Sequence, residues 1–256
     1  MVVIETDKLR KTQYKCEKEL SVKFGFDKSP RNINIVGNFS DDCCISLHPK
    51  TLAQLKKGLL KITISHMGGK PKINGFQPYF GAVRGDIRIA VGNDNQQVVF
   101  EDNCSGNYAL TLWRTAKVHI GEGTTSNGVS IFCADSGFVA GKDCMFSSDI
   151  LIQSSDQHGL VDLETGKLFN TGFRNIVLED HVWLGRKCIL LPDVIVRRGA
   201  VVGTGAVVTS EVRPASIVAG VPARTVKDNV TWTRPAHELD SFSRRMVREF
   251  QSLKNK

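Results

Sequence analysis

The sequence predicts a mainly β protein in which the chain winds into a triangular coil of short parallel strands. The first observation is a period of six: within residues 178–213 an aliphatic residue recurs at every sixth position. The second is a small or aliphatic residue four positions after each of these. An α-helix repeats its apolar residues every three or four positions and a strand every second, so neither explains a period of six. A short strand followed by a corner does explain it, because each unit then turns one large apolar side chain inward.

The inward positions can be read directly from this period. The first positions of the six units are Leu178, Leu184, Leu190, Val196, Val202 and Val208, and the fifth positions are Val182, Cys188, Val194, Ala200, Ala206 and Val212. These repeats resemble those of the hexapeptide-repeat acyltransferases. The resemblance implies a left-handed parallel β-helix in which three units make one coil.

The repeat continues upstream with two interruptions. Units begin at Ala140 and Ile152, and a fragment from Ile120 also fits. From Ile120 to Ala140 is 20 residues and from Ile152 to Leu178 is 26, and neither spacing is a multiple of six. Each interval must therefore hold residues that leave the coil. We expect a small bulge near 126–139 and a protruding loop within 153–177, which would contact the acceptor.

The remainder of the chain predicts an appendage at each end of the β-helix, which is expected over 76–232. Residues 1–75 show no period of six, so we expect an N-terminal cap of uncertain fold there. Within it, 32–37 and 61–65 alternate like strands, with a helical segment between them. Residues 233–256 carry apolar side chains every three or four positions, which predicts a C-terminal amphipathic helix.

Composition favours a cytoplasmic protein that neither crosses a membrane nor binds nucleic acid. The first residues lack the apolar run of a signal peptide, and no stretch of 18 apolar residues exists. Seven cysteines without CxxC spacing indicate a reducing compartment, and Cys144 and Cys188 fall on inward positions, where core packing explains them. The net charge is +8, but the basic residues are dispersed and no groove-reading motif is present.

The chemistry concentrates where the expected loop leaves the coil. His158 lies six residues after Ile152, with Asp156 two positions before it and Asp162 four after it. Histidine titrates at about pH 6.5 and is the natural base for a hydroxyl group at neutral pH. A neighbouring carboxylate or carbonyl would fix its tautomer, as in hydrolase triads. A histidine in a polar loop is more often an ordinary surface residue, so the surrounding motifs must decide.

Five motifs together resemble the bacterial surface-polysaccharide O-acetyltransferases, including the sialic acid and capsule O-acetyltransferases. They are AGKDCMFSSDILIQSSDQH, LETG, DHVWLG, VVGTGAVVT and AGVPARTV, in that order within residues 139–232. The resemblance implies that His158 is the catalytic base and that Trp183 lines the acetyl-CoA and acceptor site. It also implies that Arg224 of the GVPAR ending meets the nucleotide end of the cofactor. Residues before about 80 lie outside the resemblance, which leaves the choice of acceptor open.

An extended cofactor such as acetyl-CoA would lie in a groove between two prisms, close to small corner residues. The positions that match cofactor contacts in the family are Gly185, Gly203, Ala206 and Thr209, and Arg224 and Lys227 would pair with its phosphates. Corner and core packing explains the first four equally well, and a solvated surface explains Lys227 equally well. His181 is interpreted as an interface or surface residue and is not assigned to the site.

These observations predict a homotrimeric O-acetyltransferase that moves acetyl from acetyl-CoA to a hydroxyl of a capsule or lipopolysaccharide glycan. Three flat faces and closed symmetry favour three equal grooves. The chain would work beside the membrane-associated capsule machinery. Two alternatives stay open: an N-acetyltransferase acting on an amino sugar or nucleotide sugar, and a β-helix that serves only as a scaffold. No metal is expected, because no two of the six histidines have the five-residue spacing of the zinc enzymes that share this prism.

The excess of 34 basic over 26 acidic residues has two interpretations of equal weight. The residues assigned to the acceptor are Asp156, Lys167 and Arg174. In one interpretation, an anionic polysaccharide is steered by Lys167 and Arg174 together with Arg244, Arg245 and Arg248. In the other interpretation the charge serves only solubility.

Overall fold

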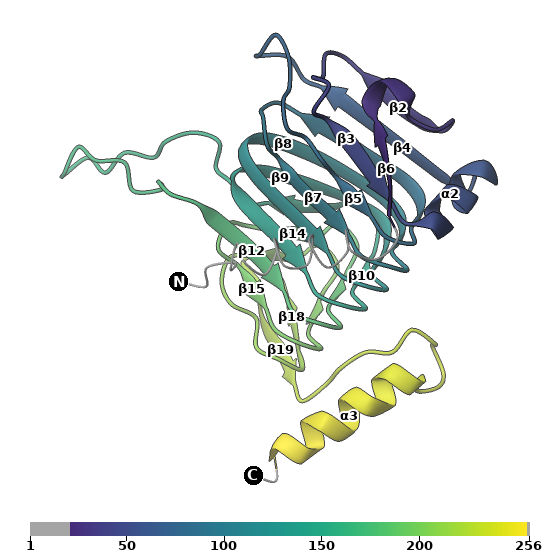
Figure 1. Ribbon diagram of the computed structural model, residues 1–256. Coiled ribbons are helices and arrows are strands. Elements are labelled where there is room, and N and C mark those ends of the chain that lie inside the picture. Colours follow the sequence, from purple (N-terminus) through teal and green to yellow (C-terminus); the bar gives the residue numbers. More distant parts are fainter. Residues whose placement is uncertain (1–20, 255–256) are drawn as a thin grey trace.

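The computed structural model describes residues 21–254 and shows a parallel β-helix of triangular cross-section, a projecting arm and a C-terminal helix (Figure 1). Three ladders of parallel strands form the sides of the prism. The first ladder contains β10 (Met145–Phe146), β13 (Trp183–Leu184), β16 (Val201–Val202) and β18 (Ser216–Ala219). The second contains β2 (Ile33–Val36), β4 (Leu60–His66), β6 (Arg84–Val91), β8 (Ser105–Ile120), β9 (Thr125–Ala140), β11 (Ile150–Gln153), β14 (Ile189–Leu190) and β17 (Val207–Val208).

The third ladder runs through the ends of the two longest strands, β8 and β9. Its other members are β3 (Cys44–Leu47), β5 (Tyr79–Phe80), β7 (Gln97–Phe100), β12 (Arg174–Leu178) and β15 (Ile195–Val196). Two strands pair antiparallel at the ends of the prism: β1 (Val22–Gly25) with β3, and β19 (Arg224–Asp228) with β18. A short 3-10 helix, η1 (Phe26–Lys28), follows β1.

The core of the prism consists of the side chains that the period of six predicts to point inward. All twelve predicted positions within 178–213 are buried, with 2% exposure or less. Stacked coils place them in columns, so that Ala140, Leu178 and Val196 lie on successive layers. Complete burial of a Val or Leu side chain contributes about 1.5–3 kcal/mol, so these columns stabilise the stack. Cys144 and Cys188 are fully buried core residues, as expected.

The expected boundary at residue 75 is corrected by the strand pairing. Ile33 of β2 pairs with Ile62 of β4, which pairs with Ile87 of β6, so the ladder already runs through the segment assigned to a separate cap. The early coils use longer strands, whose buried residues alternate every second position, and this removes the period of six. The expected strands and the helix α2 (Pro49–Lys56) are present, but they belong to these coils. Residues 1–20 of the expected cap lie outside the described residues.

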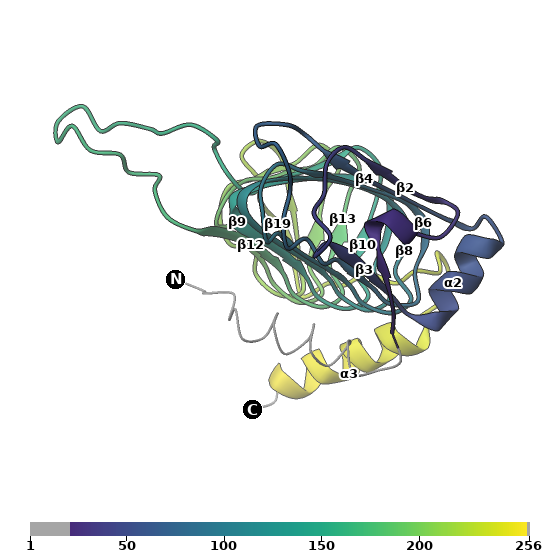
Figure 2. The same cartoon turned by 45° about the horizontal axis from the view of Figure 1, so that its top comes forward.

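The C-terminal helix α3 (Ser241–Lys254) packs on the β-helix of its own chain. Met246 is buried, the Phe242 ring centroid lies 4.9 Å from that of His181, and Phe250 lies beside the backbone of Gly199. The expected amphipathic helix is thus confirmed. Figure 1 and Figure 2 show the arm at the opposite side of the prism from α2. Among residues 21–254, no helix is long and apolar enough to cross a membrane.

Candidate active site

The arm that carries His158 leaves the prism at a corner where an earlier coil also bulges. The strand pairing aligns Ile131 and Ala140 of β9 with Leu190 and Val196 of a later coil. The first two residues are nine positions apart in the chain, whereas the second two are six apart, as in a regular unit. The extra residues of β9 lie at the corner from which residues 154–173 depart, between β11 and β12. Both expected interruptions, the bulge near 126–139 and the loop within 153–177, are therefore present, and they share one corner.

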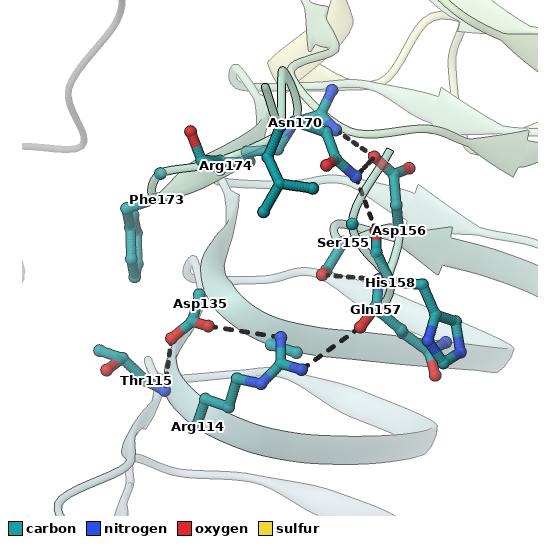
Figure 3. A pocket seen from close by; sticks show the side chains of 15 residues that line it. Arg114, Thr115, Asp135, Ser155, Asp156, Gln157, His158, Asn170, Phe173 and Arg174 are labelled. Atoms are coloured by element: carbon teal, nitrogen blue, oxygen red, sulfur yellow. Dashed lines mark hydrogen bonds and ion pairs between the residues drawn. The ribbon is translucent and has the colours of Figure 1, made fainter. Parts of the chain in front are cut away.

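This corner holds a cleft of about 510 Å³. Arg114 of β8, Asp135 of β9, and Asp156, His158 and Phe173 of the arm line it (Figure 3). Ligand sites in proteins typically measure roughly 300–1,000 Å³ and combine apolar walls with a few polar groups. The cleft therefore has the size and chemistry of a small-molecule or glycan site, and three successive coils contribute to it.

His158 presents an exposed side chain at the cleft. The residue is exposed, its carbonyl oxygen accepts a hydrogen bond from Asn170 Nδ2 at 2.8 Å, and within residues 21–254 no partner is found for its ring nitrogens. The backbone is therefore fixed while the side chain stays available. A general base needs this combination, because its ring nitrogen must accept a proton from an incoming hydroxyl.

The two aspartates beside His158 do not orient its ring, contrary to the sequence-based expectation. Asp156 Oδ2 accepts from Arg174 Nη1 at 2.6 Å and from Asn170 Nδ2 at 3.0 Å. Asp162 accepts from the backbone and hydroxyl of Thr165 in a turn at the tip of the arm, and these bonds lower the pKa of its carboxyl. Local side-chain to backbone hydrogen bonds compete successfully for short acidic residues in turns.

Arg174 joins the two ends of the arm to the prism. Its guanidinium binds Asp156 through Nη1 and Asp193 through Nε, the latter at 2.7 Å. Asp156 and Arg174, both assigned to the acceptor, line the cleft, but they bind each other. Lys167 lies farther out on the exposed arm and is not among the cleft residues. The charge of Arg174 is thus offset by two carboxylates.

Trp183 lies on another side of the prism from His158. It belongs to β13 of the first ladder, whereas His158 follows β11 of the second. Its indole Nε1–H donates to Ser147 Oγ at 3.3 Å, and its ring centroid lies 6.3 Å from that of Trp232. A single chain does not bring the two predicted catalytic residues together.

His181 occupies a buried position that sequence reasoning assigned to an interface or surface. Its Nδ1 lies 2.8 Å from Asp143 Oδ2 and its Nε2 lies 2.9 Å from the Trp232 carbonyl oxygen. Arg234 binds the other oxygen of Asp143 at 2.7 Å and lies over the Trp232 ring. This cluster fastens the C-terminal segment to the corner beside Trp183. In the sequence, this cluster is indicated only by the aromatic and basic residues of the segment TWTRP at 231–235. Nothing near this segment indicates that its partners are Asp143 and His181.

The expected cofactor residues divide into buried and exposed positions. Ala206 is fully buried in the core, so core packing accounts for it and its side chain cannot contact a cofactor. A Cβ on Gly185 would lie 2.6 Å from the Val202 carbonyl oxygen, whereas one on Gly203 would lie 3.1 Å from the Val218 carbonyl oxygen. Stacking of coils therefore requires the glycine at Gly185. Thr209, Arg224 and Lys227 are exposed on the surface.

The chain is similar in sequence to two known O-acetyltransferases. The chain is 31% identical over 126 residues to the polysialic acid O-acetyltransferase of Escherichia coli O1:K1 / APEC, a match that covers 49% of this chain and 41% of that protein. It is 28% identical over 106 residues to the galactoside O-acetyltransferase of Lactococcus lactis, covering 41% of this chain and 50% of the relative. No protein-family model matches.

A crystal structure extends the similarity to most of the chain. The polySia-specific acetyltransferase NeuO superposes with a TM-score of 0.66 and 24% identity, covering 86% of this chain and 96% of that structure. The left-handed parallel β-helix is thus confirmed. The resemblance to the sialic acid O-acetyltransferases is confirmed as well. The chain matches these curated relatives over half of their length or less.

Proposed function

We propose that this protein is an O-acetyltransferase that moves acetyl from acetyl-CoA to a hydroxyl of a bacterial surface polysaccharide, such as capsule or lipopolysaccharide. The observation that carries the proposal is the imidazole of His158, which has no hydrogen-bond partner within residues 21–254 and lines the cleft at the corner of the prism. Acetyl transfer to oxygen needs a base, because a sugar hydroxyl scarcely ionises at neutral pH. The acetyltransferase names of the similar proteins agree with this chemistry.

The proposed mechanism is direct transfer. His158 removes the proton as the acceptor oxygen bonds to the thioester carbonyl carbon, which gives a tetrahedral oxyanion. The carbon–sulfur bond then breaks and His158 returns the proton to the thiolate, so that CoA and an acetyl ester leave. A thiol with a pKa of about 8.5 is already a fair leaving group, so an acetyl-enzyme would gain little. Burial raises the pKa of the Cys188 thiol to about 12, which makes it unsuited to act as a nucleophile.

A second copy of the chain completes the proposed site. His158 and Trp183 lie on different sides of one prism, so a groove between two prisms is the arrangement that brings them together. Packing three prisms around an axis gives three such grooves with closed symmetry. In this homotrimer, acetyl-CoA lies between one chain's His158 and its neighbour's Trp183, and Thr209, Arg224 and Lys227 face the cofactor.

Mixed oligomers test the shared groove directly. His158→Ala and Trp183→Ala chains, each nearly inactive alone, are co-expressed in equal amounts. With random assortment, about a quarter of the grooves receive both native residues, so about a quarter of the activity should return. No recovery in oligomers shown to be mixed would place both residues within one chain, and a monomer by light scattering would exclude the shared groove.

The test of function is incubation of the protein with labelled acetyl-CoA and a panel of capsular and lipopolysaccharide glycans. An O-acetyl product loses its label in mild alkali, whereas the N-acetyl product of the alternative amino-sugar activity keeps it. CoA at 100 times its Kd should stabilise the fold by about 2.7 kcal/mol, and a scaffold without a cofactor site would show no shift in Tm. We also propose a cytoplasmic location near the capsule machinery, since the buried thiols of Cys104, Cys133, Cys144 and Cys188 form no disulfide.

A further inference from the structure

A second hollow, of about 460 Å³, lies beside the first cleft. Its lining consists of Trp113, Arg114, Phe132, Ala134, Gln157 and His158. Four of these residues also line the first cleft, so the two spaces meet at His158 and Arg114. In Figure 3 the His158 side chain points away from Phe173, which lies in the first cleft alone. The candidate base therefore serves both spaces, and the second differs from the first by its two aromatic residues.

Trp113 is held in place by glycines of earlier segments. A Cβ on Gly92 would lie 2.3 Å from the indole, and one on Gly69 would lie 3.6 Å from it. The Gly92 amide donates to the Leu112 carbonyl oxygen at 2.8 Å, which fixes the backbone that the indole covers. One side of the ring thus packs against this backbone, and the half-buried side chain also borders the hollow. Its orientation is set before any ligand binds.

Phe132 is the second aromatic residue of the hollow. Ile131 and Cys133 on either side of it are buried in the core, so strand alternation turns Phe132 outward. It pairs with Thr111 in the strand ladder, one coil from the strand of Trp113. The polar residues Arg114 and Gln157 lie at the same hollow, and the guanidinium of Arg114 is held by Gln157 O and, loosely, by Asp135. The result is an aromatic surface with polar groups at its edge.

A pyranose ring has the matching chemistry. Its C–H face is apolar and packs on aromatic rings, while its hydroxyl groups bond to polar groups around the edge. We propose that Trp113 and Phe132 form the subsite that binds a pyranose ring of the acceptor glycan, with one of its hydroxyls directed to His158. This inference rests on the proposed O-acetyltransferase function. It also bears on acceptor choice, because both residues precede the 139–232 segment whose motifs resemble the family.

The test compares Trp113→Leu and Trp113→Phe with the native protein. The acceptors are polysialic acid oligomers and a neutral maltose oligomer, and KM is measured for acceptor and for acetyl-CoA. Loss of aromatic packing should raise the acceptor KM about tenfold in Trp113→Leu. Trp113→Phe should recover most of this loss, and the acetyl-CoA KM should stay within about twofold of its native value. Leu59→Ala is the control, since Leu59 is 55% exposed beside α2, away from the arm, and lines neither space.

Binding measurements separate this subsite from the reaction. Calorimetry of both glycans with His158→Ala, with and without Trp113→Leu, reports the subsite even if neither glycan is acetylated. Binding that Trp113→Leu weakens about tenfold supports the subsite, and binding without acetylation then contradicts the proposed function alone. An unchanged acceptor KM in a folded Trp113→Leu protein, an equal rise in the acetyl-CoA KM, or no binding of either glycan to the native protein would overturn the subsite.

Discussion

The imidazole of His181 stacks on the indole of Trp232, with ring centroids 4.1 Å apart and planes 7° from parallel. The two residues also exchange hydrogen bonds: His181 Nε2 lies 2.9 Å from the Trp232 carbonyl oxygen, and Trp232 Nε1–H donates to the His181 carbonyl oxygen at 2.8 Å. They stand 51 positions apart in the chain, so this contact fastens the segment after β19 to a corner of the prism. Trp183, two residues after His181, shares that corner. The position of the C-terminal segment and that of the candidate cofactor residue are therefore linked.

Replacement of Trp232 should destabilise the protein and release its C-terminal segment. Trp232→Ala removes a buried aromatic side chain, for which a cost of about 3–5 kcal/mol is typical. Trp232→Phe keeps a stacked ring but loses the N–H donor, so its cost should be about 1 kcal/mol for the hydrogen bond. Urea unfolding measures both costs, and limited proteolysis should cut Trp232→Ala after residue 228. Equal unfolding midpoints for the two variants would show that the stack contributes nothing.

His158→Ala should lose about 10²–10⁴ of kcat and still bind CoA, because the base transfers a proton during the reaction and is not needed to hold the cofactor. His237→Ala is a matched control, since His237 is an exposed histidine outside both spaces that His158 lines. The rates are followed by release of CoA thiol, and CoA binding by calorimetry. A fully active His158→Ala protein would refute the base, and an acetyl-cysteine found by mass spectrometry would replace direct transfer with a two-step scheme.

The sequence predicted the prism because a period of six reports side chains that share one apolar interior, and Leu184 and Val202 are buried as that period requires. The interruption of this period between Ile152 and Leu178 predicted the arm, because residues that leave the coil do not keep its spacing. The sequence did not predict that the early coils belong to the β-helix, because strands such as β4 bury every second residue and this pattern is common to many β folds. Partners distant in sequence could not be found this way: Asp156 pairs with Arg174 rather than His158, and His181 meets Trp232.

Two glycines with positive φ should respond very differently to alanine. Gly106 has φ +114°, and a Cβ there would lie 1.8 Å from the Ser126 carbonyl oxygen of the next coil. Gly205 has φ +70° with nothing within 4 Å of the same position. Gly205→Ala should therefore cost only about 1–2 kcal/mol of backbone strain. Gly106→Ala must also separate two coils, so it should lower Tm further or prevent folding. Similar Tm values for the two variants would contradict this close approach.

Buried thiols should reduce stability at alkaline pH. Burial raises the pKa of the Cys144 and Cys188 thiols to about 12 each, whereas an unfolded cysteine titrates at about 8.5. Above about pH 9 the unfolded chain therefore releases protons that the folded chain retains, and stability falls as pH rises. The Cys144→Ala/Cys188→Ala protein should show a smaller loss of Tm between pH 8 and about 10.5.

Activity provides a second check on the same two cysteines. Acetyl transfer by Cys188→Ala should be retained, because the thiol is a core side chain with no part in the reaction. Parallel Tm curves for the native and doubly substituted proteins would show that these thiols ionise equally in both states.

The salt dependence of the reaction should reveal whether the acceptor is anionic. Arg174 is offset by Asp156 and Asp193, so steering of an anionic polymer must come from exposed charges such as Lys167 on the arm and Arg248 on α3. Such steering is screened within about 8 Å at physiological ionic strength, so the polymer KM should rise steeply with added salt while the acetyl-CoA KM rises less.

Lys167→Ala should raise the polymer KM a few-fold at low salt and change little at high salt, since screening already removes its contribution there. Lys57→Ala is the control, because Lys57 is an exposed lysine at the end of α2, on the far side of the prism from the arm (Figure 1). A polymer KM that is flat between low and moderate salt, or a clear preference for a neutral glycan, would instead assign the surplus of 34 basic over 26 acidic residues to solubility. The aromatic hollow at Trp113 could then still select the acceptor, because packing of a sugar ring on an indole does not depend on charge.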